Sequence, residues 1–190
     1  CVGVLGNVSG CAMSIVSFYS HVSGTGKTLS LSFGNSAFMS PLDVHMFQPK
    51  DTDNALYNGL GTLGDLSGSM DEVTLMGDDQ RAVDMAYSIT LGREKNALDK
   101  NREAREPEKW TAPLRVSTNK SLYEMYDTAM SQSSPTALRT LQFELHDKVF
   151  VDQYGKHMAN VLRKNYGHAL PEIADEVIRM GGVEPVWEKG

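Results

Sequence analysis

The sequence predicts an α/β fold in which helices flank a central, mostly parallel sheet. Three observations support this prediction: an uncharged apolar run at 11–20, a glycine-rich turn after it, and alternating strand-like and helical patterns further along the chain. A run rich in β-branched and aromatic residues, without charges, is typical of a strand that is covered on both faces. Alternation of strands and helices is typical of layered α/β folds.

The later elements follow from residue periodicity and from capping residues. Helices are expected at 29–33, 53–61, 78–91 and 121–130 and within 146–165, and strands at 114–118 and 141–145. Asp78 or Asp79 can cap the 78–91 helix, and Ser121 with Glu124 forms a capping-box pattern. The last helix has Pro171 near its start and ends at Gly181 and Gly182, with Ile173, Ala174, Val177 and Ile178 on one face. We expect one domain over 11–182, between a lead-in (1–10) and a tail (183–190).

Composition excludes several classes of protein. The 190 residues are 41% hydrophobic and 22% charged, as in a typical globular domain. No uncharged apolar run approaches the roughly 20 residues that cross a bilayer, so no membrane partner is expected. The net charge of −6 argues against coating nucleic acid with the whole surface, but it permits one basic loop. Cys1 and Cys11 suggest neither a disulfide framework nor a metal site, which favours a reduced, intracellular protein. The chain starts without Met, so we expect a segment of a longer protein.

The strongest local signal is a glycine-rich turn directly after the apolar strand. It consists of Ser23, Gly24, Thr25, Gly26, Lys27 and Thr28. Glycine permits the backbone N–H groups to approach phosphate oxygens closely, as the turn between a strand and a helix start does in phosphate-binding loops. Lys27 would contact the β- and γ-phosphates of a triphosphate, and the Thr28 hydroxyl would hold Mg²⁺. The first Gly of the usual pattern is His21 here, and a chance Gly-Lys-Thr in a surface turn is the alternative.

An acidic pair, Asp71 and Glu72, is the second signal. At the end of a strand, Asp71 could hold Mg²⁺ through water while Glu72 polarises the attacking water. The residues before the pair, 64–69, are unusually polar for a central strand. A solvated surface pair is the alternative.

Two residues further along complete the predicted constellation. Asn119 follows the 114–118 strand, where its amide could hydrogen-bond the γ-phosphate and the attacking water without adding charge. A plain helix N-terminal role beside Ser121 is the alternative. Arg139 precedes the 141–145 strand and, placed across a subunit boundary, could neutralise charge that develops on the γ-phosphate. An ordinary surface Arg is the alternative.

The order of these motifs resembles that of AAA+ ATPases. The order is Gly-Thr-Gly-Lys-Thr, Asp-Glu, Ser-Thr-Asn and then an Arg before a strand. More narrowly, it is similar to the helicase-like ATPase domains of bacteriophages, plasmids and genomic islands, which are often fused to primase modules. The stretches 51–56, 91–113 and 165–172 are also similar to segments of that group, so the resemblance covers residues 10–180.

The resemblance implies cofactors, partners and a location. It implies an AAA+-like P-loop domain that uses ATP and Mg²⁺, a homo-oligomeric ring, usually a hexamer, single-stranded DNA in the pore, and a primase module in the parent protein. The location would be the cytoplasm of a bacterium or phage-infected host. The DNA-facing loop would be 93–109, with Arg93, Lys95, Lys100 and Arg102 on phosphates. Six basic and five acidic side chains there also fit a charged loop that balances its own signs.

The sequence therefore predicts an ATP-hydrolysing motor domain that acts on DNA in phage or mobile-element replication. Catalysis would involve Glu72, Asn119 and Arg139, nucleotide binding the turn at 23–28, and the metal site Thr28 and Asp71. Two other classes stay open. One is a nucleotide-dependent assembly or clamp in which hydrolysis is weak or vestigial, and the other is a remodeller that threads protein.

Overall fold

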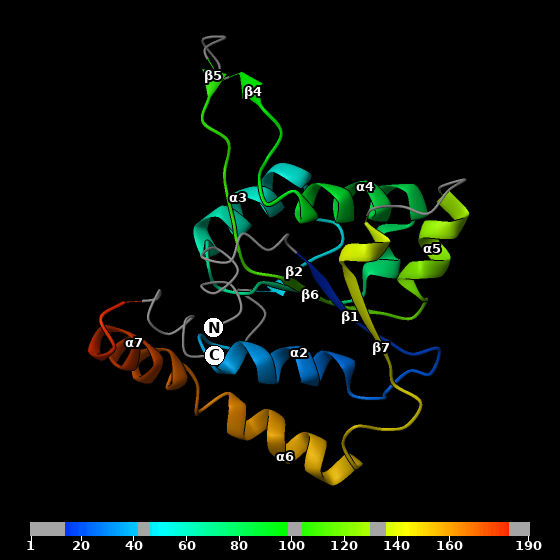
Figure 1. Cartoon of the computed structure of the whole chain (residues 1–190). Helices are drawn as coiled ribbons and strands as arrows, with labels where there is room; N and C mark the ends of the chain where they lie inside the picture. The colour runs from blue at the N-terminus through cyan, green and yellow to red at the C-terminus, as the bar shows by residue number, and fades with distance from the viewer. Residues whose placement is uncertain (1–13, 42–45, 99–103, 130–135, 183–190) are drawn as a thin grey trace.

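A five-stranded sheet in which all neighbouring strands run parallel forms the centre of the protein (Figure 1). This computed structural model describes residues 14–41, 46–98, 104–129 and 136–182. The strands are β1 (Ile15–Tyr19), β2 (Met46–Phe47), β3 (Ser69–Met70), β6 (Leu114–Thr118) and β7 (Thr140–Glu144), and their order across the sheet is β2-β3-β6-β1-β7. The α/β fold with a parallel sheet, predicted from the sequence, is confirmed.

Helices cover both faces of this sheet. Helices α2 (Lys27–Ser36) and α6 (Asp152–Leu162) lie on one side, and α3 (Asp53–Leu63), α4 (Asp79–Thr90) and α5 (Leu122–Ala129) lie on the other (Figure 1). Two single-turn helices, η2 (Val73–Met76) and η3 (Ala137–Arg139), precede α4 and β7, and α7 (Ala169–Arg179) ends the described chain. Asp78 caps α4 by accepting the N–H of Gln80 at 2.9 Å. Among the described residues, no helix combines the length and apolar composition of a membrane span.

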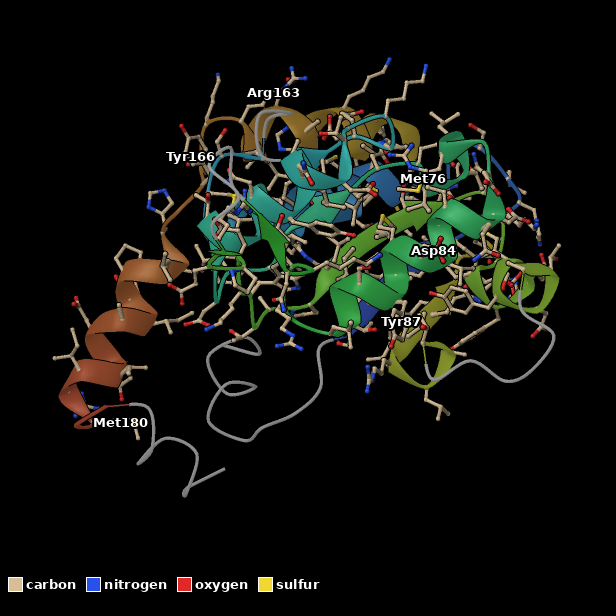
Figure 2. The ribbon with its side chains drawn as sticks, turned by 90° about the horizontal axis from the view of Figure 1, so that it is seen from above. Met76, Asp84, Tyr87, Arg163, Tyr166 and Met180 are labelled. Carbon is tan, nitrogen blue, oxygen red and sulfur yellow. The ribbon has the colours of Figure 1, made fainter. Side chains whose placement is uncertain are left out.

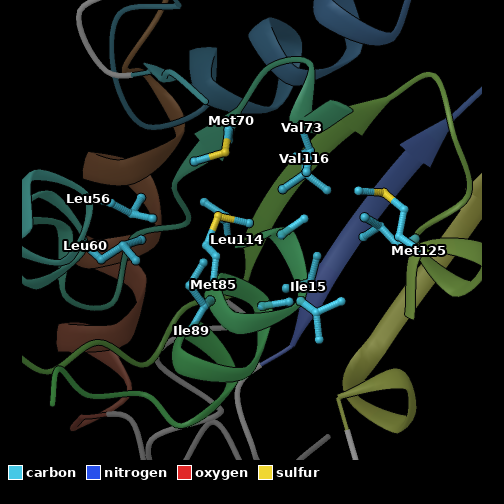
Figure 3. Close-up of a cluster of buried hydrophobic side chains, with 14 of the residues drawn as sticks. Ile15, Leu56, Leu60, Met70, Val73, Met85, Ile89, Leu114, Val116 and Met125 are labelled. Atoms are coloured by element: carbon cyan, nitrogen blue, oxygen red, sulfur yellow. The ribbon is translucent and has the colours of Figure 1, made fainter. Parts of the chain in front are cut away.

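The main hydrophobic core lies between the sheet and helices α3, α4 and α5 (Figure 3). The alternate residues Leu114 and Val116 of β6 are fully buried there, as is Ile89 of α4. On the opposite side, Leu31 of α2 is fully buried. By contrast, the predicted apolar face of α7 is not buried, since no residue of that helix is buried and Ile178 is 75% exposed.

The charged segment 93–109 is not a plain loop. Its described part contains two short antiparallel strands, β4 (Ala97–Leu98) and β5 (Ala104–Arg105), which project from the α3 and α4 side of the molecule (Figure 1). At the base of this arm the buried Glu94 carboxylate pairs with the Arg105 guanidinium and also accepts the Glu108 N–H at 3.4 Å. The pairing of the two strands was not predicted, because it joins residues that are several positions apart in a charged stretch without strand-like alternation.

Trp110 connects the arm to the core. Its backbone N–H donates to the Gly92 carbonyl at 3.1 Å, and its indole N–H donates to the Ile89 carbonyl at 3.0 Å. The indole ring stacks on Tyr57 with ring centroids 5.7 Å apart. Because Trp110 is only 2% exposed, its side chain provides both apolar burial and a buried hydrogen bond.

We expect the substitution Trp110→Phe to lower the free energy of unfolding by about 2–3 kcal/mol. The smaller ring loses packing, and the Ile89 carbonyl loses its donor in a buried setting. Urea denaturation measures the change, with Tyr87→Phe as the control. Tyr87 is 45% exposed, so its change should stay within about 0.5 kcal/mol. Equal stabilities of the two variants would contradict the assigned role of the indole.

Candidate functional site

The predicted site residues meet where three parallel strands end. Strand β6 lies between β1 and β3, with Thr118 in register with Tyr19 and Val116 in register with Met70. The segments that follow these strands therefore leave the sheet at one edge. Ligands of open α/β sheets bind at the carboxyl ends of the strands, so this edge is the expected place for a site.

The turn after β1 has the backbone that a phosphate-binding loop requires. Gly24 and Gly26 have φ angles of 77° and 101°, in the region that favours glycine. Gly26 is the N-cap of α2 and provides no side-chain cap for the N–H groups of the first turn. The chain after β7 packs against this turn, because the Val149 N–H donates to the Thr25 carbonyl at 2.8 Å. A helix start of this kind, preceded by glycines, fits an anionic phosphate.

Lys27 is buried and holds its ammonium group among neutral oxygens. Its Nζ donates to Asn119 Oδ1 at 2.8 Å and to the Ser20 carbonyl at 3.3 Å. Neither of these two acceptors is a carboxylate. Lys27 therefore makes no ion pair with any residue that the structure describes, and its positive charge is not neutralised. A buried cation in this state attracts a phosphate strongly.

Thr28 and Asp71 form a pair of oxygen donors beside Lys27. The Thr28 hydroxyl donates to the two Asp71 carboxylate oxygens at 3.0 and 3.1 Å, and the Ser117 hydroxyl also donates to Asp71. Hydroxyl and carboxylate oxygens suit Mg²⁺, which is usually held by one or two carboxylates together with substrate phosphates. In the part of the chain that the structure describes, no group of three or more His, Cys, Asp or Glu residues could hold a metal ion alone.

Glu72 adopts an unusual backbone conformation. Its φ and ψ of 57° and 59° are left-handed, and among the described residues no other residue besides glycine has a positive φ. Such a conformation costs on the order of 1 kcal/mol and persists where neighbours enforce it. Here the Glu72 N–H donates to the buried Ser117 hydroxyl at 2.9 Å. The carboxylate accepts the Asn119 amide N–H at 2.7 Å and the Thr74 hydroxyl.

The sequence assigned no role of its own to Ser117, which stands within the Ser-Thr-Asn motif, and none to Thr74. Ser117 is fully buried, and its hydroxyl accepts from Glu72 and donates to Asp71. A serine two residues before Asn119, near the end of an apolar strand, was the available signal, because a buried hydroxyl needs partners. Thr74 lies in η2, a helix that the sequence did not predict.

The polar residues before Asp71 belong to a buried hydrogen-bond network. Ser69 of β3 exchanges hydrogen bonds with the Asn35 amide at 2.8 and 3.2 Å. The Arg115 guanidinium donates to Asn35 Oδ1 at 2.6 Å and to the Ser67 hydroxyl at 3.0 Å. Burial lowers the pKa of Arg115 to about 10. Gly34 makes room for this group, since a Cβ there would lie 1.7 Å from Arg115 Nη1.

The other predicted residues lie away from this edge. Arg139 ends η3 just before β7, at the amino ends of the strands, and its Nη1 donates to the Thr90 carbonyl at 3.4 Å. A strand of five residues spans roughly 16 Å, so Arg139 cannot act on the Lys27 site of its own chain. Arg93 and Lys95 are exposed at the base of the arm. Lys100 and Arg102 lie outside the described residues.

The fold, a parallel sheet with its candidate site at the carboxyl edge, is similar to that of a helicase. Among solved structures, the chain is similar to one described as "SCCmec type IV Cch - active helicase", with a TM-score of 0.72 and 19% sequence identity over 95% of this chain. The chain spans 33% of the length of that helicase. At this identity the likeness concerns the fold alone. No protein-family profile and no curated protein sequence matches the chain.

We expect Ser117→Ala to lower the free energy of unfolding by about 1–3 kcal/mol. The substitution removes a buried hydroxyl that serves both the Glu72 N–H and the Asp71 carboxylate. Ser17→Ala on neighbouring β1 is the matched control. Its hydroxyl is equally buried but has no hydrogen-bond partner in the described structure, so its loss should be neutral or stabilising. Chemical denaturation compares the two, and a larger loss for Ser17→Ala would exclude this assignment.

Proposed function

We propose that this chain is the ATP-hydrolysing motor domain of an AAA+-type DNA helicase or translocase. The observation that carries the proposal is a continuous chain of contacts at one edge of the sheet. It runs from the Lys27 ammonium through the Asn119 amide to the Glu72 carboxylate, with the Thr28 and Asp71 oxygens beside it. The likeness to a helicase fold supports the same proposal.

Each group in the site has a defined task in this proposal. ATP supplies a terminal phosphoanhydride, and Mg²⁺ would be held by the Thr28 hydroxyl with support from Asp71. Lys27 binds the β- and γ-phosphates through its ammonium group. Glu72 accepts a proton from the water that attacks the γ-phosphorus, and Asn119 senses the γ-phosphate because its amide contacts both Lys27 and Glu72.

The partners belong to the proposal as well. A ring, usually a hexamer, would bring Arg139 of one subunit to the nucleotide of the next, since it cannot reach its own. Single-stranded DNA would contact the arm through Arg93 and Lys95, both of which are exposed. We place the protein in phage or mobile-element DNA replication in the bacterial cytoplasm, beside a primase module in the parent chain.

An ATPase assay with nucleotide-binding measurements tests the motor site. Lys27→Ala should abolish nucleotide binding or turnover and leave the circular dichroism spectrum unchanged. Glu72→Gln should still bind ATP but hydrolyse it about 10²–10³-fold more slowly, because the amide cannot accept the proton. Lys50→Ala, an exposed lysine outside the site, is the control. Unchanged turnover in Glu72→Gln would remove Glu72 from the mechanism, and turnover that single-stranded DNA does not stimulate would favour the clamp.

A mixing experiment tests whether Arg139 acts between subunits. Arg139→Ala and Lys27→Ala should each hydrolyse ATP poorly alone, by about 10³-fold or more for the Arg variant. Their mixture should recover part of the activity, because some subunit boundaries then combine an intact Lys27 with an intact Arg139. Wild-type turnover by Arg139→Ala alone, or no recovery on mixing, would contradict the assignment.

A further inference from the structure

The outer side of α6 carries a concentration of positive charge that the proposed motor site does not use. Residues 153–168 contain no Asp or Glu, although the whole chain has a net charge of −6. Lys156, Arg163 and Lys164 are exposed there, and within the described part of the chain none of their side chains makes an ion pair or hydrogen bond. Elsewhere, Arg81, Arg105, Lys109, Lys120 and Arg179 pair with carboxylates, whereas the exposed Lys50, Arg93 and Lys95 make no ion pair within the described residues.

The helix places these charges in a row. Asn160 follows Lys156 by four residues and Arg163 follows Asn160 by three, so the three side chains share one face of the helix. Measured along the helix axis from Lys156, Asn160 lies about 6 Å away and Arg163 about 10.5 Å away. Lys164 flanks the row. On the inner side, Leu162 is buried, since α6 packs on α2. Figure 2 shows Arg163 pointing outward from α6, with Tyr166 just beyond the helix. We call Lys156, Asn160, Arg163 and Lys164 the α6 basic face.

The composition of this face favours a nucleic acid over a protein partner. Centres of protein–protein interfaces are depleted in Lys and enriched in aromatic residues, Met and Arg, and of these enriched types the α6 basic face contains only Arg163. Phosphate oxygens are contacted by Lys, Arg and Asn, which are the residue types of this face. Tyr166, just beyond the helix, is 43% exposed and offers a ring face on which an unpaired base can stack.

We infer that the α6 basic face binds the phosphate backbone of single-stranded nucleic acid. This surface is distinct from the 93–109 arm, because α6 lies on the α2 side of the sheet whereas the arm projects from the α3 and α4 side (Figure 1). Binding at α6 needs neither ATP nor Mg²⁺. It goes beyond the proposed motor function, which assigns no role to α6.

Fluorescence anisotropy of a labelled oligothymidylate, without nucleotide, tests the inference. The triple variant Lys156→Gln, Arg163→Gln, Lys164→Gln should raise the Kd at low salt by about tenfold or more. It should also reduce the slope of log K against log salt by about 2, because each lost phosphate contact removes about 0.7. The three side chains are exposed, so thermal unfolding should match the wild type.

A matched control separates local contacts from net charge. The double variant Lys50→Gln, Arg179→Gln removes two positive charges from exposed sites elsewhere and should keep the wild-type Kd within about twofold, whereas the charge-matched α6 double variant Lys156→Gln, Arg163→Gln should still weaken binding. Because the assay contains no nucleotide, wild-type binding together with absent ATP turnover would contradict the motor proposal and leave this inference standing.

Three results would overturn the inference. The first is equal binding by the α6 double variant and the charge-matched control, or no binding by the wild type. The second is loss of binding only in the arm variant Arg93→Gln, Lys95→Gln. The third is competition by polyglutamate as effective as by unlabelled oligothymidylate, which would identify an acidic protein surface as the partner.

Discussion

The contact on which the site depends is the Asn119 amide between Lys27 and Glu72. The amide oxygen accepts from the ammonium group, and the amide N–H donates to the carboxylate. An amide has both a donor and an acceptor and carries no charge, so it satisfies both ions without cancelling either. A direct Lys–Glu ion pair would instead neutralise the two groups that phosphate binding and water activation need. The sheet order places this amide between the two groups, since Asn119 follows β6, which lies between β1 and β3.

The acidic pair is held by a neighbouring strand rather than by its own. Strand β3 has only two residues and ends at Met70, and the chain then turns through the left-handed conformation of Glu72. The fully buried Ser117 hydroxyl of β6 receives the N–H of that strained residue and donates to Asp71. Strain at such a position persists because the surroundings over-determine it. The short strand therefore needs the longer one beside it to orient both carboxylates.

Local residue patterns were sufficient to predict several helices and strands. Features that depend on contacts between distant residues could not be predicted from the sequence. The 114–118 strand matches β6, and the 53–61 and 78–91 helices match α3 and α4 within two residues. The turn at 23–28 is predictable because a few consecutive residues contain its signal. The sheet order, the two strands of the arm and the role of Ser117 depend on contacts between distant residues. Ser121 shows the same limit: its hydroxyl accepts the Glu124 N–H, as predicted, but also a Gln142 amide from β7.

Helix α2 connects the candidate nucleotide site with the helix that carries the α6 basic face. Its first residue is Lys27, its buried Asn35 bonds to Ser69 just before the acidic pair, and its outer side packs on α6. Arg115 strengthens the link at Asn35, and the absence of a side chain at Gly34 gives its guanidinium room. Packed helices move as rigid elements, because interiors are dense and resist continuous deformation. Through these contacts α2 connects the phosphate-binding turn with strand β3, which precedes Asp71, and with the helix that carries the basic face.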